Sequence, residues 1–270
     1  TFAIMADSKA LTKNEQIGIG TSVLYDVTGD SKFSTTVVNL AAAYTLRLPG
    51  DSVGEISIAI QPSMTQKRLD LTKLNFDNQF NGNFFDPGLP VNENLQRLSR
   101  WYFDVSVGGR GKLIFNQRND LEIGFSAYNL LQPKQSFFDA QGVRLDPRFN
   151  GMIKINHQFN KKVQLQPGFL MSRQGRFSSY NIGMNVYYDI SQSRYLEHQL
   201  FAGIYGRTRD AGDLILGMVY GGWTFAGSFD FNFSTLVPAS NYQGGFEIAL
   251  IYVLKKPLKR PAYKACPPYL

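Results

Sequence analysis

The sequence is poor in the residues on which most metal proteins and small secreted domains depend. Its 270 residues include one Cys and two His. A single Cys excludes a disulfide scaffold and a four-thiolate zinc site. Two histidines and one distant Cys are also too few for a metal site of the usual kind, so we expect no cofactor.

Long apolar runs are absent as well. The longest one, Ile248 to Leu254, is far shorter than the roughly 18 residues that a spanning helix requires. The first residues, Thr1 to Ile4, show no basic region followed by an apolar one. We therefore expect a targeting signal to be either absent or already removed.

Charged residues are few and scattered. Asp, Glu, Lys and Arg make up 18% of the chain, below the roughly 25% of soluble domains. The net charge is +7, but Lys and Arg do not gather into the patch or stripe that nucleic-acid binding uses. We expect no nucleic-acid partner.

Aromatic residues are abundant, at 14% of the chain, and they stand in alternating patterns. In 225–234 every second residue is Phe or Gly and the residues between them are small or polar; 180–190 and 246–254 repeat the arrangement. Period two predicts β-strands, and helical spacing is nearly absent. The predicted strands are 16–27, 33–48, 53–65, 101–115, 120–130, 148–159, 163–173, 179–190, 198–208, 214–223, 225–235 and 243–255, and a thirteenth begins at Phe2.

Two architectures compete for such an all-β chain, a soluble sandwich or propeller and a transmembrane antiparallel β-barrel. The predicted strands run ten residues or more, which matches the nine to eleven that cross a bilayer better than the five or six of soluble strands. The residues opposite the apolar ones are rich in Gly, Ser and Asn rather than in Lys and Glu. The barrel is therefore the favoured prediction.

The lengths of the connections agree with a barrel that spans residues 1–256. If the last strand ends in the periplasm, the two longest connections, about 66–100 and 131–147, both fall outside the cell. The short turns near 49–51, 116–119 and 160–162 then fall inside. We expect residues 257–270, which are basic and rich in Pro, to form a periplasmic tail.

Several short motifs, in their order along the chain, resemble the PorP/SprF family, outer-membrane proteins of the Bacteroidota type IX secretion system. The motifs are Phe84-Phe85-Asp86-Pro87-Gly88-Leu89-Pro90, Ser126-Ala127-Tyr128-Asn129-Leu130 with Gln132-Pro133-Lys134, Leu200-Phe201-Ala202-Gly203-Ile204-Tyr205 with Arg207 and Asp210, Phe233-Ser234-Thr235-Leu236 through Gly244-Gly245-Phe246-Glu247-Ile248-Ala249-Leu250-Ile251-Tyr252, and Cys266-Pro267. The family usually opens with an Asn-Pro-Ala segment and a Trp-bearing strand, and neither precedes Thr1. Twelve or thirteen strands then fit a complete barrel of fourteen.

The resemblance implies a non-enzymatic component of the secretion and gliding apparatus in the outer membrane. Such a protein anchors or helps to export a secreted cargo, for example a large surface adhesin with a C-terminal sorting domain. Its partners are that cargo, other secretion components including periplasmic proteins or lipoproteins, and outer-membrane lipid. A diffusion porin or substrate-specific channel is the alternative, because the strand number fits a water-filled bore.

An outer-membrane hydrolase is the third hypothesis, and the two histidines argue against it. An outer-membrane esterase would need Ser, His and an orienting partner on one face. His157 shares its strand face with Ile153 and Ile155, and His198 lies at the start of a strand beside Glu197. We therefore predict no catalytic residues.

Charges on the predicted lumen side of the strands are expected to form ion pairs with one another, because an unpaired charge in a low-dielectric lumen is costly. We assign them a structural role, with ion selectivity as the alternative. They are Asp104, Arg110, Glu122, Lys154, Asp189, Arg207 and Glu247.

The strongest candidates for partner binding are large apolar residues in the two long connections, where ordinary loops carry few. Two interpretations remain open: the residues fold inward as a plug or cap, or they present an apolar patch to another protein. A second candidate is the basic tail, which lies near anionic head groups or docks onto a periplasmic component. The candidate residues are Phe76, Phe80, Phe84, Phe85, Leu89, Phe137 and Phe138 in the loops, and Lys255, Lys256, Lys259 and Arg260 in the tail.

Overall fold

The computed structural model of the chain describes eleven stretches of sequence. They are residues 1–9, 16–29, 32–48, 54–70, 74, 76–90, 98–137, 142–191, 198–208, 210–234 and 242–254. The tail residues Lys255, Lys256, Lys259 and Arg260, together with Phe138, lie outside them.

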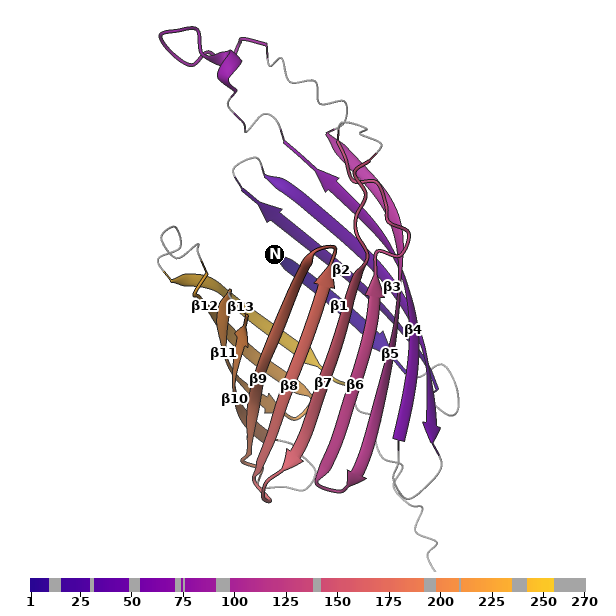
Figure 1. Cartoon of the computed structure of the whole chain (residues 1–270). Helices are drawn as coiled ribbons and strands as arrows, with labels where there is room; N and C mark the ends of the chain where they lie inside the picture. Colours follow the sequence, from indigo (N-terminus) through magenta and orange to yellow (C-terminus); the bar gives the residue numbers. More distant parts are fainter. Residues whose placement is uncertain are drawn as a thin grey trace, which may run out of the picture. The chain divides into compact units, whose positions relative to one another are not determined.

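Thirteen strands form one antiparallel sheet in which each strand neighbours the next one in sequence (Figure 1). The strands are β1 (Phe2–Ser8), β2 (Ile17–Thr28), β3 (Phe33–Leu48), β4 (Gly54–Arg68), β5 (Ser99–Asn116), β6 (Asn119–Tyr128), β7 (Arg148–Gln158), β8 (Val163–Gln174), β9 (Phe177–Asp189), β10 (His198–Arg207), β11 (Ala211–Tyr220), β12 (Trp223–Asn232) and β13 (Gln243–Tyr252). The prediction of an all-β antiparallel chain is confirmed. In the described part the helical content is one 3-10 turn, η2 (Asp77–Gln79), and no helix there is long and apolar enough to cross a membrane.

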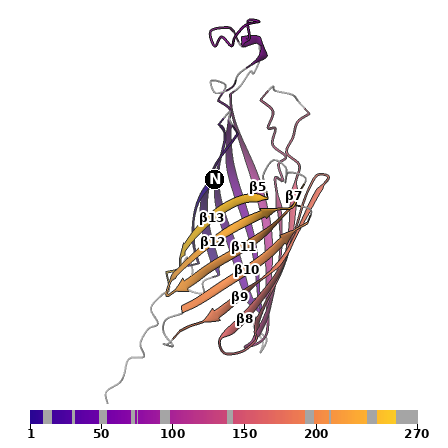
Figure 2. The same cartoon turned by 90° about the vertical axis from the view of Figure 1, so that its left-hand side faces the viewer.

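The chain divides into two compact units. Unit 1 comprises Thr1–His157 and Gln166–Gly183, and unit 2 comprises Gln158–Leu165 and Met184–Leu270. In unit 1 antiparallel pairing joins β1 through β7, so the β4–β5 and β6–β7 connections leave from the same end of the strands (Figure 1). In unit 2 the strands β10 to β13 lie side by side (Figure 2).

The two faces of the sheet differ in composition because side chains alternate along each strand. One face, which we call the apolar face, carries large hydrophobic side chains that are exposed, such as Ile58 at 62%, Leu216 at 58% and Ile248 at 79%. Among the described residues, Ala127 and Ala211 are the buried hydrophobic ones, and no large side chain is fully buried. A soluble sandwich would instead bury its large apolar side chains between two sheets. The opposite face, which we call the polar face, carries small, polar and charged residues.

The strands differ from the sequence-based ranges at their ends. β4 runs on to Arg68 and β5 begins at Ser99, because backbone pairing continues where the apolar alternation has stopped. β11 begins at Ala211 for the same reason. The register of the β12–β13 pair shifts between Phe229 and Phe231, where a step of two residues along β12 corresponds to a step of three along β13.

Candidate functional site

The β4–β5 connection contains a small self-bonded unit, residues 76–90, which we call the aromatic module. A backbone bond from Leu69 N to Leu98 O (2.9 Å) closes the connection at its base. Within the module, Asp86 N donates to Gln79 O (2.7 Å), and Phe80 and Phe85 form a β-bridge. The buried Gln79 side chain accepts a hydrogen bond from Phe76 N at 3.1 Å. The module therefore holds its own backbone in shape.

The aromatic module presents large apolar side chains to its surroundings. Phe80, Phe84 and Phe85 are 58%, 61% and 42% exposed. Phe76 and Leu89 are half-buried. Residues 76–90 include two aspartates and no Lys or Arg, so the exposed rings stand on a negatively charged unit.

The β6–β7 connection behaves differently. Its first part, residues 129–137, which we call the strap, lies across the polar face of three neighbouring strands. Leu131 N donates to the Asp104 carboxylate on β5 at 3.1 Å, and Lys67 Nζ on β4 donates to Gln135 Oε1 at 2.7 Å. Asp104 is 3% exposed, so its carboxylate is satisfied by the strap rather than by water.

The far end of the strap reaches β3 through an aromatic contact. Phe137 packs edge-on against Phe33, with ring centroids 6.2 Å apart. Phe137 is half-buried, unlike the rings of the aromatic module. Apolar residues of the long connections were expected either to fold inward or to form a patch for another protein. The contact with Phe33 shows that Phe137 folds inward.

Removing the Asp104 carboxylate is expected to release the strap. An Asp104→Ala protein leaves Leu131 N without its acceptor, and a lost hydrogen bond to a charged group costs about 1.5–3 kcal/mol. The measurement is limited proteolysis between residues 129 and 147, which we expect to become at least several-fold faster. Ser63→Ala is the control, because Ser63 lies opposite Asp104 and donates only to its backbone carbonyl. Equal proteolysis of both variants would contradict the anchoring role.

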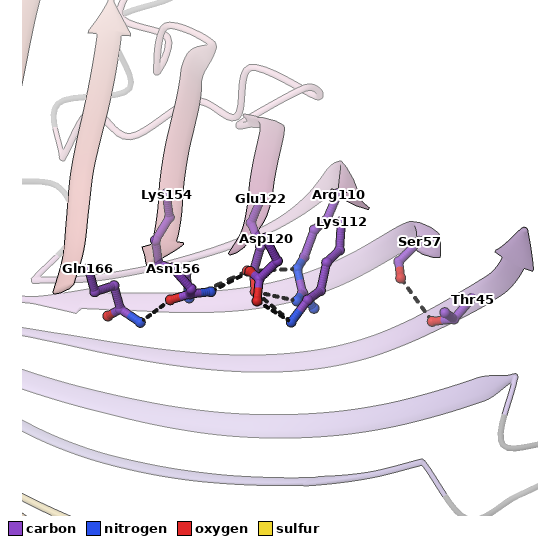
Figure 3. Close-up of polar contacts among 9 residues, drawn as sticks. All are labelled: Thr45, Ser57, Arg110, Lys112, Asp120, Glu122, Lys154, Asn156 and Gln166. Atoms are coloured by element: carbon purple, nitrogen blue, oxygen red, sulfur yellow. Dashed lines mark hydrogen bonds and ion pairs between the residues drawn. The ribbon is translucent and has the colours of Figure 1, made fainter. Parts of the chain in front are cut away.

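Farther down the polar face, charged and amide side chains form a continuous network (Figure 3). Its centre is Glu122 on β6, whose side chain is 7% exposed. Arg110 approaches it at 3.0 Å, Lys154 at 3.4 Å and Lys112 at 3.6 Å. The expectation of mutual ion pairs is confirmed for Arg110, Glu122 and Lys154.

The network continues toward β8 through Asp120 and then through two side-chain amides. Lys112 also meets Asp120 at 3.5 Å, and Asn156 donates to Asp120. Gln166 then donates to Asn156 Oδ1 at 2.6 Å. On β3 and β4, Thr45 and Ser57 share a hydrogen bond of 2.9 Å (Figure 3).

The remaining polar-face charges are distributed along unit 2. Arg207 pairs with Asp210 at 3.0 Å and lies 3.9 Å from Asp213. The Asp189 carboxylate accepts a hydrogen bond from Ser191 N. Glu247 is exposed.

The two histidines make structural contacts. His157 Nδ1 lies 2.6 Å from Asn119 Oδ1, and the His198 ring stacks on Tyr220 at 4.4 Å. Among the described residues, no group of three or more His, Cys, Asp or Glu is placed to hold a metal ion.

The strap is the part of this arrangement that sequence reasoning missed. Asp104 was expected to pair with a cation, but its observed partner is a backbone N–H in another connection. In the structure the chain turns sharply here, since Asn129 and Gln132 both take positive φ angles, 58° and 47°. The sequence contains a weak signal for this turn. Asn is several-fold enriched in that region, so Asn129 before Gln132-Pro133 indicates a sharp change of direction at the end of β6.

A sheet with one face of polar and charged side chains and one face of exposed large apolar side chains is typical of a membrane protein that crosses the bilayer with strands. The comparison with family models agrees. The model described as "Type IX secretion system membrane protein PorP/SprF" matches residues 1–252, and the chain belongs to that family.

No curated protein matches the chain. Nine chains of solved structures do. One, described as "Crystal structure of a Pseudomonas aeruginosa FadL homologue", has 9% sequence identity and a TM-score of 0.44, and the match covers 86% of this chain and 69% of that one.

Proposed function

We propose that the sheet closes into a barrel in the outer membrane, with its apolar face toward lipid and its polar face toward an aqueous interior. Closure removes the unpaired strand edges that hydrocarbon does not tolerate. The exposed apolar side chains of the described strands support this arrangement, as does membership of a membrane-protein family. The β4–β5 and β6–β7 connections then both face outside the cell.

In this proposal the protein is a non-enzymatic anchor that holds a secreted cargo at the cell surface. The observation that carries the proposal is the aromatic module, whose internal hydrogen bonds hold Phe80, Phe84 and Phe85 exposed. Exposed aromatic residues on a rigid support are typical anchors of protein interfaces. Its two aspartates favour a cargo surface with apolar pockets and a basic rim.

In this proposal Phe76 and Leu89 support the exposed rings from within the aromatic module. Phe137 holds the strap against Phe33 on β3. The basic residues Lys255, Lys256, Lys259 and Arg260 are proposed to dock a periplasmic secretion component. If the cargo is an adhesin, the proposal includes a role in gliding.

A diffusion channel is the second candidate, because charged and small residues line the polar face. The strap argues against it, since the strap covers the polar face of β3, β4 and β5 at one end. Conductance in planar bilayers separates the two functions. A large, steady conductance would favour the channel.

The anchoring function is tested by replacing all three exposed rings, Phe80, Phe84 and Phe85, with Ser. Burying one Phe is worth about 1.5–3 kcal/mol, and 1.4 kcal/mol is tenfold in affinity. We therefore expect cargo retention in isolated outer membranes to fall at least tenfold, while the heat-modifiable migration of the barrel is unchanged. Phe177→Ser is the control, because Phe177 is 84% exposed in the β8–β9 hairpin. Unchanged retention in the triple variant would overturn the assignment.

A further inference from the structure

The polar face of unit 1 contains a hollow of about 390 Å³ between the strap and the charged network. Its floor is made of small residues from three adjacent strands, Ala59 on β4, Gly108 on β5 and Ser126 on β6. The registers place these residues side by side, with Ala59 opposite Gly108 and Gly108 opposite Ser126. Because these three side chains are small, they leave open space above the sheet that larger side chains would fill.

Larger apolar side chains surround this floor. Tyr128, Met152 and Leu170 line the hollow from β6, β7 and β8, and its lining is mainly apolar. Met152 leans over Gly124, because a Cβ at Gly124 would lie 3.2 Å from the Met152 side chain. An apolar concavity in a face that is otherwise charged and hydrophilic is the usual form of a binding site.

Two cations lie near opposite ends of the hollow, because the strand registers place Arg110 on β5 level with Met152 and Arg148 on β7 opposite Tyr128. Arg110 lines one end and belongs to the network, in which three cations face the two carboxylates of Glu122 and Asp120. At the other end the exposed Arg148 donates to Asn150, which also lines the hollow. Apolar walls between two positively charged ends suit a ligand that has an apolar centre and negative flanks.

We propose that this hollow is a second docking site for the cargo, which receives one large apolar side chain from an acidic segment of the secreted polypeptide. The proposal rests on the anchoring function and adds a contact on the polar face of the wall. An aromatic or leucine side chain enters between Met152 and Leu170. Carboxylates that flank it on the segment face Arg110 and Arg148.

Occupancy is tested by a photo-crosslinking residue, p-benzoylphenylalanine, placed at Ala59 in the full-length protein in cells. The matched control carries the same residue at Ala249, which is exposed on the polar face of unit 2. We expect ultraviolet light to join position 59, but not position 249, to the secreted protein that co-purifies with the barrel. Mass spectrometry should map the joined peptide to a segment with a large apolar residue and net negative charge.

Affinity is tested by filling the hollow. Ala59→Phe should weaken binding of the purified C-terminal domain of the co-purified secreted protein at least tenfold, and Ala249→Phe should leave it unchanged. Barrel migration on unheated gels checks that both variants fold. Binding to the unaltered protein should also weaken as salt rises from 0.05 to 0.5 M, because the contact is between opposite charges.

Several outcomes would overturn the site. They are a cross-link from position 59 to lipid only, a joined peptide that is basic or lacks a large apolar residue, or full binding by a folded Ala59→Phe protein. If these occur while the triple Phe variant releases cargo, the hollow is refuted and the anchoring function stands. If the triple variant also retains cargo, the anchoring function fails with it.

Discussion

Replacing Glu122 with Ala is expected to lower the free energy of unfolding by about 2 kcal/mol, because the substitution removes the nearly buried carboxylate that three partly exposed cations share. The Glu122 carboxylate contacts Arg110, Lys112 and Lys154, and its side chain is 7% exposed, against 25–38% for the three cations. Asp120 still pairs with Lys112 in the variant. The other two cations then repel each other across β6 without a carboxylate between them.

The measurement is unfolding by denaturant of the protein refolded into lipid bilayers, followed by tryptophan fluorescence. Glu55→Ala is the matched control, because Glu55 pairs with an Arg47 side chain that is 59% exposed. Exposed pairs contribute about 1 kcal/mol or less. A loss in Glu122→Ala no greater than that of the control would show that the network does not stabilise the wall.

Replacing Ile248 with Arg is expected to destabilise the membrane-inserted protein by about 2–4 kcal/mol, the cost of a cation at the lipid side of a barrel strand near the bilayer centre. Ile248 is 79% exposed and lies in the middle of β13, opposite Gly227 on β12. The small neighbour leaves the introduced side chain surrounded by lipid rather than by protein.

The neighbouring substitution Glu247→Arg supplies the control, since Glu247 is also exposed but lies on the polar face. We expect it to change the unfolding free energy by less than 1 kcal/mol, because water reaches that face. Equal effects of the two substitutions would mean that the two faces do not lie in different solvents. The proposed barrel would then be wrong.

The strands were predictable because their signal is local. Alternation in 180–190 and 246–254 follows from the two-residue period of a pleated strand, and β9 and β13 occupy those positions. The ends of β4 and β5 were harder to predict from the sequence, because residues such as Lys67 and Arg100 pair through their backbones and do not continue the apolar pattern.

The candidate site was predictable in part. Apolar residues in a long connection identify the aromatic module as unusual, and the structure shows Phe80, Phe84 and Phe85 exposed. The strap and the hollow depend on residues far apart in sequence. Asp104 meets Leu131 across 27 positions, and Ala59 meets Ser126 only through the register of β5. No local pattern encodes those pairings.

The base of the β4–β5 connection has a consequence for how such proteins diversify. Leu69 and Leu98 are joined through main-chain atoms, so the join does not depend on which side chains the intervening segment carries. Segments of different length and chemistry can therefore be exchanged between these two residues without rebuilding the strands that hold them. Proteins with the same strands can in this way bind different partners through different β4–β5 connections.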